Sequence, residues 1–143
     1  MDSTQKLAEE IRAFTWHLTR KMAQESTHIG KLTPSQEAVA VRIHQQPGRT
    51  GAEISRQLFL TPQSINVTVM TMIDEGFVEV RKSARDGRRR ELYLTASGNA
   101  EVEKIRAYKT LWLREELDEK LTDEEREQAL AALASLKKVL PEL

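Results

Sequence analysis

The sequence predicts a mainly α-helical (α+β) fold with one small β-hairpin. Two short helical segments, 51–58 and 62–75, are joined by a brief turn at 59–61, which is the pattern of a helix-turn-helix. Two strand-like runs, 77–82 and 90–95, follow directly and enclose a basic turn. Long helical segments with apolar stripes flank this block on both sides. The order predicts a winged helix-turn-helix with long N- and C-terminal helices.

Four threonines mark the expected starts of helices. Each is followed three residues later by Gln, Glu or Ser, so its hydroxyl can accept a free backbone N–H of the first turn. The four sites are Thr33-Pro34-Ser35-Gln36, Thr50-Gly51-Ala52-Glu53, Thr61-Pro62-Gln63-Ser64 and Thr122-Asp123-Glu124-Glu125. Pro47-Gly48 and Gly76 are expected to end the helices opened by Thr33 and Thr61.

Apolar residues at helical spacing define the terminal segments. The first helix is expected from about residue 4 to 26, helical structure resumes near Ala96, and the last helix opens at Thr122 and ends at Pro141. An exposed apolar stripe needs a partner, so the terminal helices are predicted to form a dimerisation region with a second copy of the chain. The residues expected at that interface are Leu7, Ile11, Phe14, Trp112, Leu117, Leu130, Leu133, Leu136 and Leu140.

The charge is unevenly distributed. The chain has 143 residues, which suits one structural domain, with 22 basic and 22 acidic side chains. Its expected parts are an N-terminal dimerisation helix (1–30), a winged lobe (31–98) and C-terminal dimerisation helices (99–143). Six Lys and Arg face one acid, Asp86, between residues 81 and 90, which gives a local charge of +5. If the chain binds nucleic acid, this segment is therefore the expected site of the electrostatic contact.

Several function classes are excluded or disfavoured. The absence of cysteine excludes disulfides and thiolate chemistry. No apolar run approaches the ~20 residues that span a bilayer, so a soluble, cytoplasmic protein with no membrane partner is expected. The spacing of His17, His28 and His44 does not suit a metal site, and no cofactor is expected. With no Ser/His/Asp order or glycine-rich phosphate loop, the chain is not expected to be an enzyme.

The second helix of a helix-turn-helix lies in the major groove of double-stranded DNA. An inward stripe formed by Ile65, Val69, Met72 and Ile73 would leave the other side of the helix to face the bases. On that side, Gln and Asn amides can bond adenine, and a Val methyl can contact thymine. The basic turn of the hairpin can place an arginine in the minor groove, and Arg88 is the favoured candidate. The residues expected to bind DNA are Thr50, Thr61, Pro62, Gln63, Ser64, Asn66, Val67, Arg85, Arg88 and Arg89.

Some of these residues are expected to contact bases and others to contact phosphates. Gln63 and Asn66 are predicted to read bases. The helix-start hydroxyls of Thr50, Thr61 and Ser64, together with Arg85 and Arg89, are predicted to contact phosphates.

Residues 32–98 resemble the multiple antibiotic resistance regulator (MarR) family of bacterial transcription factors. The resemblance is carried by Leu32-Thr33-Pro34-Ser35-Gln36, Pro47-Gly48, Glu53-Ile54-Ser55, Gly76-Phe77-Val78, Asp86-x-Arg88 and Leu94-Thr95-x-x-Gly98, and more loosely by Leu121-Thr122-Asp123-Glu124-Glu125. It implies a homodimer that binds a pseudo-palindromic operator, usually represses, and is often released by a small, frequently phenolic ligand.

The chain departs from the family pattern at two positions. The family often has Arg where Val80 stands, a partner that braces the wing aspartate, so Asp86 is expected to pair with Arg81 or Arg90 instead. The family also often has a basic residue where Val67 stands, so contacts there should differ.

Two further hypotheses remain open at this stage. A winged helix can also serve as a protein-interaction module without binding DNA. A small aromatic or anionic effector could enter the crevice between the dimerisation helices and the winged lobes and alter their spacing, as the family resemblance and Trp16 near Arg12 and Arg20 suggest, although aromatic residues on helical stripes more often pack in a core or dimer contact.

Overall fold

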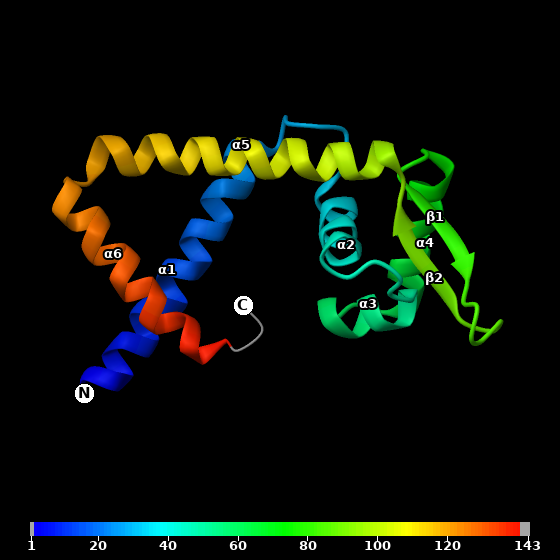
Figure 1. Cartoon of the computed structure of the whole chain (residues 1–143), viewed down its shortest axis with the longest axis horizontal. Helices are drawn as coiled ribbons and strands as arrows, with labels where there is room; N and C mark the ends of the chain where they lie inside the picture. The colour runs from blue at the N-terminus through cyan, green and yellow to red at the C-terminus, as the bar shows by residue number, and fades with distance from the viewer. Residues whose placement is uncertain (1, 141–143) are drawn as a thin grey trace. The chain divides into compact units, whose positions relative to one another are not determined.

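The computed structural model describes residues 2–140. Its secondary structure is, in chain order, α1 (Ser3–Ser26), α2 (Pro34–Gln45), α3 (Gly51–Leu58), α4 (Pro62–Asp74), β1 (Val78–Lys82), β2 (Arg90–Leu94), α5 (Ala96–Lys120), α6 (Asp123–Leu136) and a 3₁₀ turn (Lys137–Val139) (Figure 1). The chain forms two compact units. The winged lobe comprises residues 26–108, and the terminal unit comprises residues 1–25 and 109–143. None of the described helices is long and apolar enough to cross a membrane.

The predicted helix starts are confirmed. Thr33, Thr50, Thr61 and Thr122 are all N-cap residues with extended backbone, and each hydroxyl accepts the N–H three residues later. Thr33 and Thr122 close complete capping boxes. A fifth threonine, Thr95, was not predicted as a cap, yet its hydroxyl accepts the N–H of Gly98 at 3.1 Å and donates to the carbonyl of Gly76. Local hydrogen bonds thus fix where these helices begin.

The hydrophobic core lies entirely within the winged lobe. Among the described residues, the buried hydrophobic side chains are Leu32, Val39, Ala40, Ile43, Ile54, Ile65, Val69, Met72, Phe77, Val78, Leu92, Val102 and Ile105. Apart from Leu32 and Phe77, which lie just before α2 and β1, they come from α2, α3, α4, both strands and the first part of α5. The lobe predicted over 31–98 therefore corresponds to a unit that also holds Val102 and Ile105 of α5.

The turn between α3 and α4 carries an unusual side chain. Phe59 has a φ of 54°, and its side chain is 95% exposed. A left-handed conformation is unfavourable for a residue with a Cβ, and Gly or Asn is more usual at such a helix end. Phe59 is thus strained and gains no packing in return within the described chain.

The hairpin is antiparallel, and it is attached to the helix-turn-helix along one edge. Val78 pairs with Leu94 and Lys82 with Arg90. The backbone of Leu92 also exchanges two hydrogen bonds of 2.9 Å with the segment before α3, accepting from Gly48 and donating to Arg49. This third run of chain was not predicted, because Pro47-Gly48 was interpreted only as a helix stop.

The terminal unit has no core of its own. Many of its large apolar side chains are exposed within one chain, as Phe14 (66%), Leu130 (62%) and Trp16 (57%) illustrate, and others, such as Trp112 and Leu136, are half-buried. None of the described hydrophobic residues in 2–25 or 109–140 is buried. The prediction for the last helix was wrong in one respect. α6 ends at Leu136, and Leu140 follows the 3₁₀ turn with a non-helical backbone. The expected stop at Pro141 lies outside the described residues.

A close backbone contact explains the glycine that follows the cap of α5. A Cβ built on Gly98 would lie 2.1 Å from the carbonyl oxygen of Phe77 and 3.3 Å from Leu94. Since Phe77 also accepts the N–H of Thr95 at 3.0 Å, the start of α5 is pressed directly onto the chain that enters the hairpin. Only glycine fits this position without displacement of the backbone.

We therefore predict that Gly98→Ala lowers the free energy of unfolding by about 2–3 kcal/mol, because backbone atoms must move to admit the methyl group. Chemical denaturation measures this change. Gly87→Ala is the matched control, since a Cβ there meets nothing within 4 Å. Equal stability of the two variants would show that the contact at Phe77 does not constrain the fold.

Candidate nucleic-acid interface

The exposed face of α4 is the first part of the candidate interface. Ile65, Val69 and Met72 are buried and Ile73 is partly buried against the same core, which confirms the predicted inward stripe. On the other side, Val67 is 69% exposed and Met70 is 59% exposed. The predicted base-reading residues Gln63 and Asn66 are also exposed. α4 thus presents uncharged amide and aliphatic groups to solvent.

The hydroxyls expected to contact phosphates are engaged in capping. Thr50 accepts the N–H of Glu53 at 3.2 Å, and Thr61 accepts the N–H of Ser64 at 3.1 Å. The hydroxyl of Thr61 also donates to that of Ser64 at 3.1 Å. Pro62 occupies the first helical position of α4, where the absence of an N–H leaves no donor unpaired. Thr50 thus orders the N-terminus of α3, and Thr61, Pro62 and Ser64 order the N-terminus of α4.

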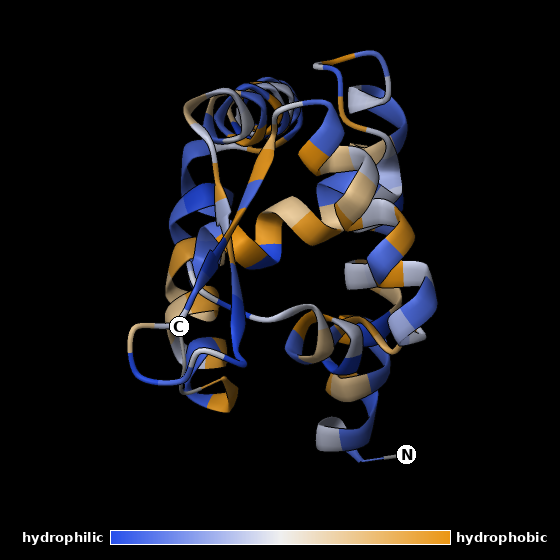
Figure 2. Ribbon diagram, turned by 90° about the vertical axis from the view of Figure 1, so that its right-hand side faces the viewer, coloured by the Kyte–Doolittle hydropathy of each residue, from blue (hydrophilic) through white to orange (hydrophobic). Residues whose placement is uncertain are grey.

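The tip of the hairpin is the second part of the candidate interface. Its backbone is shaped by two side chains: Ser83 accepts the N–H groups of Arg85 and Asp86 at 3.2 and 3.3 Å, and Asp86 accepts the N–H of Arg88 at 3.0 Å. The side chains of Arg85 and Arg88 are exposed. Figure 2 shows this end of the hairpin as hydrophilic, in contrast to the apolar residues nearer α5. The tip is a structured cationic loop.

The structure does not support the predicted pairing of Asp86. Among the described residues, its carboxylate bonds the backbone of Arg88. Arg81 instead pairs with Glu79, and its guanidinium carbon lies 4.3 Å from the ring centroid of Tyr93. The prediction that Arg81 braces Asp86 is wrong, because the strand register places Arg81 opposite Glu91 and its guanidinium contacts Glu79 and the Tyr93 ring instead. Arg90, the other candidate, is exposed.

Arg89 differs from its neighbours in the tip. Its Nη1 lies 2.6 Å from Glu53 Oε1, its Nε lies 3.2 Å from Glu91 Oε2, and its Nη2 donates to the carbonyl of Gly48 at 3.4 Å. Because these groups occupy the guanidinium, we revise its predicted phosphate contact: Arg89 joins the hairpin to α3. Sequence reasoning missed Glu53 as a partner, since no local pattern reports a contact across 36 positions of chain; it also missed Glu91 of β2, two residues from Arg89.

The ion pair between Arg89 and Glu53 has an electrostatic signature. The hydrogen bond from Arg89 holds the pKa of the Glu53 carboxyl below its ordinary value of 4.5, against the opposing effect of burial. The hydrogen bonds to Glu53 and Glu91 raise the pKa of Arg89 in turn. The link between the hairpin and α3 is therefore strongest when Glu53 is ionised.

These features define a class of protein. Two short helices with an exposed second helix, followed by a hairpin with a cationic tip, form a winged helix-turn-helix. The sequence comparison agrees with this class, because residues 31–89 match the profile of the MarR family. The matched segment covers most of residues 32–98, for which the resemblance to this family was predicted.

A curated relative matches the same class. The chain is 43% identical over 56 residues to the HTH-type transcriptional regulator PetP of Rhodobacter capsulatus. The match covers 39% of this chain and 34% of PetP, so it spans about a third of that protein's length.

Solved structures share the fold over nearly the whole chain. A MarR family protein from Bacillus stearothermophilus superposes with a TM-score of 0.78 at 20% identity, covering 99% of each chain. A mutant of MepR from S. aureus, bound to an oligodeoxyribonucleotide, superposes with a TM-score of 0.63 at 23% identity, covering 94% of this chain and 97% of that one. The terminal helices and the winged lobe both have counterparts in such structures.

We predict that Glu53→Gln lowers stability at neutral pH and that its deficit relative to the unchanged protein shrinks as the pH falls. A carboxyl whose pKa is lowered by folding stabilises the fold above its unfolded pKa, here 4.5, and loses that contribution as the pH falls through its folded pKa. Thermal unfolding between pH 6 and pH 3 measures the deficit. Glu127→Gln, in an exposed glutamate of α6, is the control. A deficit that stays constant over this range would contradict the proposed role of the ion pair.

Proposed function

We propose that this protein is a sequence-specific regulator of transcription that binds double-stranded DNA as a homodimer and acts by binding rather than catalysis. The observation that carries the proposal is the pairing, in one lobe, of an uncharged exposed α4 with a structured cationic hairpin tip. The first suits the base edges of the major groove, and the second suits the minor groove and the phosphates. PetP is an HTH-type regulator, and the MepR structure holds DNA; both support the proposal.

The site residues divide into two groups under this proposal. Gln63, Asn66 and Val67 on α4 would contact bases. Arg88 would enter the minor groove, and Arg85 would contact phosphate. Repression by occupation of a promoter is the mode that the family resemblance favours, and the site of action would be the cytoplasm, where bacterial DNA lies.

The dimer is proposed from the terminal unit. An apolar surface that no part of its own chain covers is stabilised by a second copy, and the exposed Phe14, Leu130 and Leu133 supply that surface. A two-fold dimer presents two recognition helices, so its operator would contain half-sites about one helical turn, ~10 base pairs, apart.

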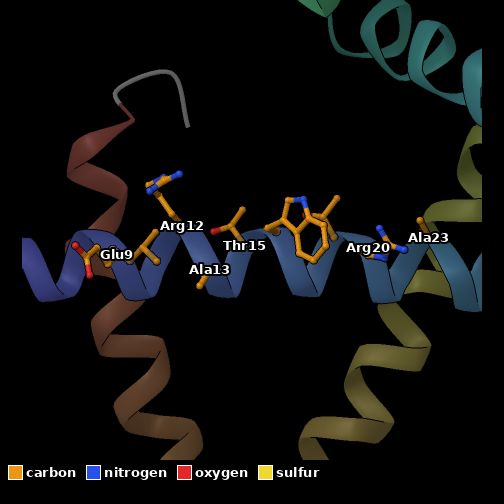
Figure 3. A pocket seen from close by; sticks show the side chains of 9 residues that line it. Glu9, Arg12, Ala13, Thr15, Arg20 and Ala23 are labelled. Atoms are coloured by element: carbon orange, nitrogen blue, oxygen red, sulfur yellow. The ribbon is translucent and has the colours of Figure 1, made fainter.

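An effector is proposed for the terminal unit as well. An open groove of about 880 Å³ runs along α1, lined by Arg12, Trp16 and Arg20 among others; Figure 3 shows the labelled side chains following that helix. The guanidinium carbon of Arg20 lies 5.2 Å from the centroid of the Trp16 ring. An indole flanked by guanidinium groups suits an aromatic anion. Calorimetric titration with phenolic acids that gives no heat would remove this part of the proposal.

We predict that Arg88→Ala weakens DNA binding by roughly 10- to 100-fold while stability changes by less than about 0.5 kcal/mol, because an exposed tip residue packs against little. Affinity for duplex DNA over a range of salt concentrations measures both the loss and the phosphate contribution. Arg114→Ala, in an exposed arginine of α5, is the charge-matched control. A protein-interaction module would bind duplex DNA weakly, with no difference between the two variants.

We predict that Phe14→Glu weakens the dimer by roughly 10- to 100-fold, because it replaces buried interface area with a charge. Sedimentation equilibrium measures the change in dissociation constant. Arg12→Glu is the control, since two residues along a helix turn the side chain by roughly 200° to the opposite face. An unchanged dimer in the Phe14 variant would place the interface elsewhere.

A further inference from the structure

The exposed face of α4 lacks cations. No Lys or Arg occurs between Pro62 and Asp74, and Asp74 is the one charged residue in the helix. Arg and Lys supply the commonest specific contact to guanine, through its O6 and N7 atoms in the major groove. α4 therefore cannot select G·C pairs by that contact.

Val67 stands at the centre of the exposed face. It is two residues away from Ile65 and two from Val69, which are 1% and 7% exposed. Because each residue turns a helix by about 100°, Val67 points away from the core on both counts. With 69% of its side chain exposed, it offers two methyl groups where a base-reading residue would be expected to offer a polar group.

The residues one turn to either side of Val67 are Gln63 and Thr71. Thr71 donates its hydroxyl proton to the carbonyl of Val67 at 3.0 Å, so that proton is already used within the helix. Gln63 is exposed and carries a free-standing amide of the kind that bonds adenine N6 and N7. Both chemistries on this face, methyl and amide, match A·T pairs.

Asn66 is exposed, but its amide lies at the edge of the exposed face of α4 and not at its centre. A Cβ built on Gly51 would lie 3.6 Å from its Oδ1, so the amide lies beside the N-terminus of α3. Asn66 also lines, with Met70 and Arg90, a hollow between α4 and the hairpin. It occupies the flank of α4, and Val67 faces outward.

We propose that Val67 is the specificity-determining residue of α4 and that it selects thymine by contact with the 5-methyl group in the major groove. This inference rests on the proposed function. It assigns to each half-site of the operator a T·A pair that is recognised through the thymine methyl group and not through a charged hydrogen bond.

The test replaces thymine by deoxyuridine, which removes the methyl group and keeps every hydrogen-bonding atom. In the duplex that the full-length protein binds most tightly from a random pool, each thymine is replaced in turn and affinity is measured. One position per half-site should lose roughly fourfold, the value of one buried methyl group. In Val67→Ala the same replacement should cost clearly less, because the two γ-methyl groups that contact the thymine methyl are removed.

Arg114→Ala, at an exposed arginine of α5 outside the proposed DNA contacts, is the control and should keep its sensitivity to deoxyuridine. Tight, salt-dependent binding that is indifferent to deoxyuridine at every position would overturn this inference and leave the proposed function standing. Sensitivity that persists undiminished in Val67→Ala would also overturn it. Failure to bind any duplex would overturn the proposed function and this inference together.

Discussion

The burial of Ile65, Val69 and Met72 is the constraint on which the rest of the structure depends. It fixes the rotation of α4 about its own axis, and so it decides which side chains α4 presents to solvent. The same core holds β1 and the start of α5 against the helices, which sets the direction of the hairpin. A rotated α4 would expose a different set of side chains, so packing in the core and chemistry at the surface are two results of one arrangement.

The hairpin is positioned by polar contacts that add to this core. Backbone hydrogen bonds between Leu92 and the 48–49 segment join β2 to the chain before α3, and Arg89 joins the same region through Glu53. These links leave Arg85 and Arg88 as the exposed cations of the shaped tip. Arg89 therefore holds the hairpin, whereas its near neighbours Arg85 and Arg88 face solvent.

Much of this could be predicted from the sequence, and the failures share a physical cause. The caps at Thr33, Thr50, Thr61 and Thr122 depend on residues three positions apart, so the sequence contains all the information. The partners of Arg89 depend on strand register and on a residue 36 positions away, which no local pattern contains. The cap at Thr95 was missed because Gly98, three residues later, supplies only a backbone N–H.

We propose that the winged lobe reads a specific DNA sequence as part of a dimer. Selection of bound duplexes from a random DNA pool by the full-length protein tests it most directly. The account predicts enrichment of an inverted repeat with half-sites about one helical turn apart, bound with an affinity that falls steeply as salt increases. A folded protein that enriches no sequence, or a single half-site without its inverted partner, would contradict the account.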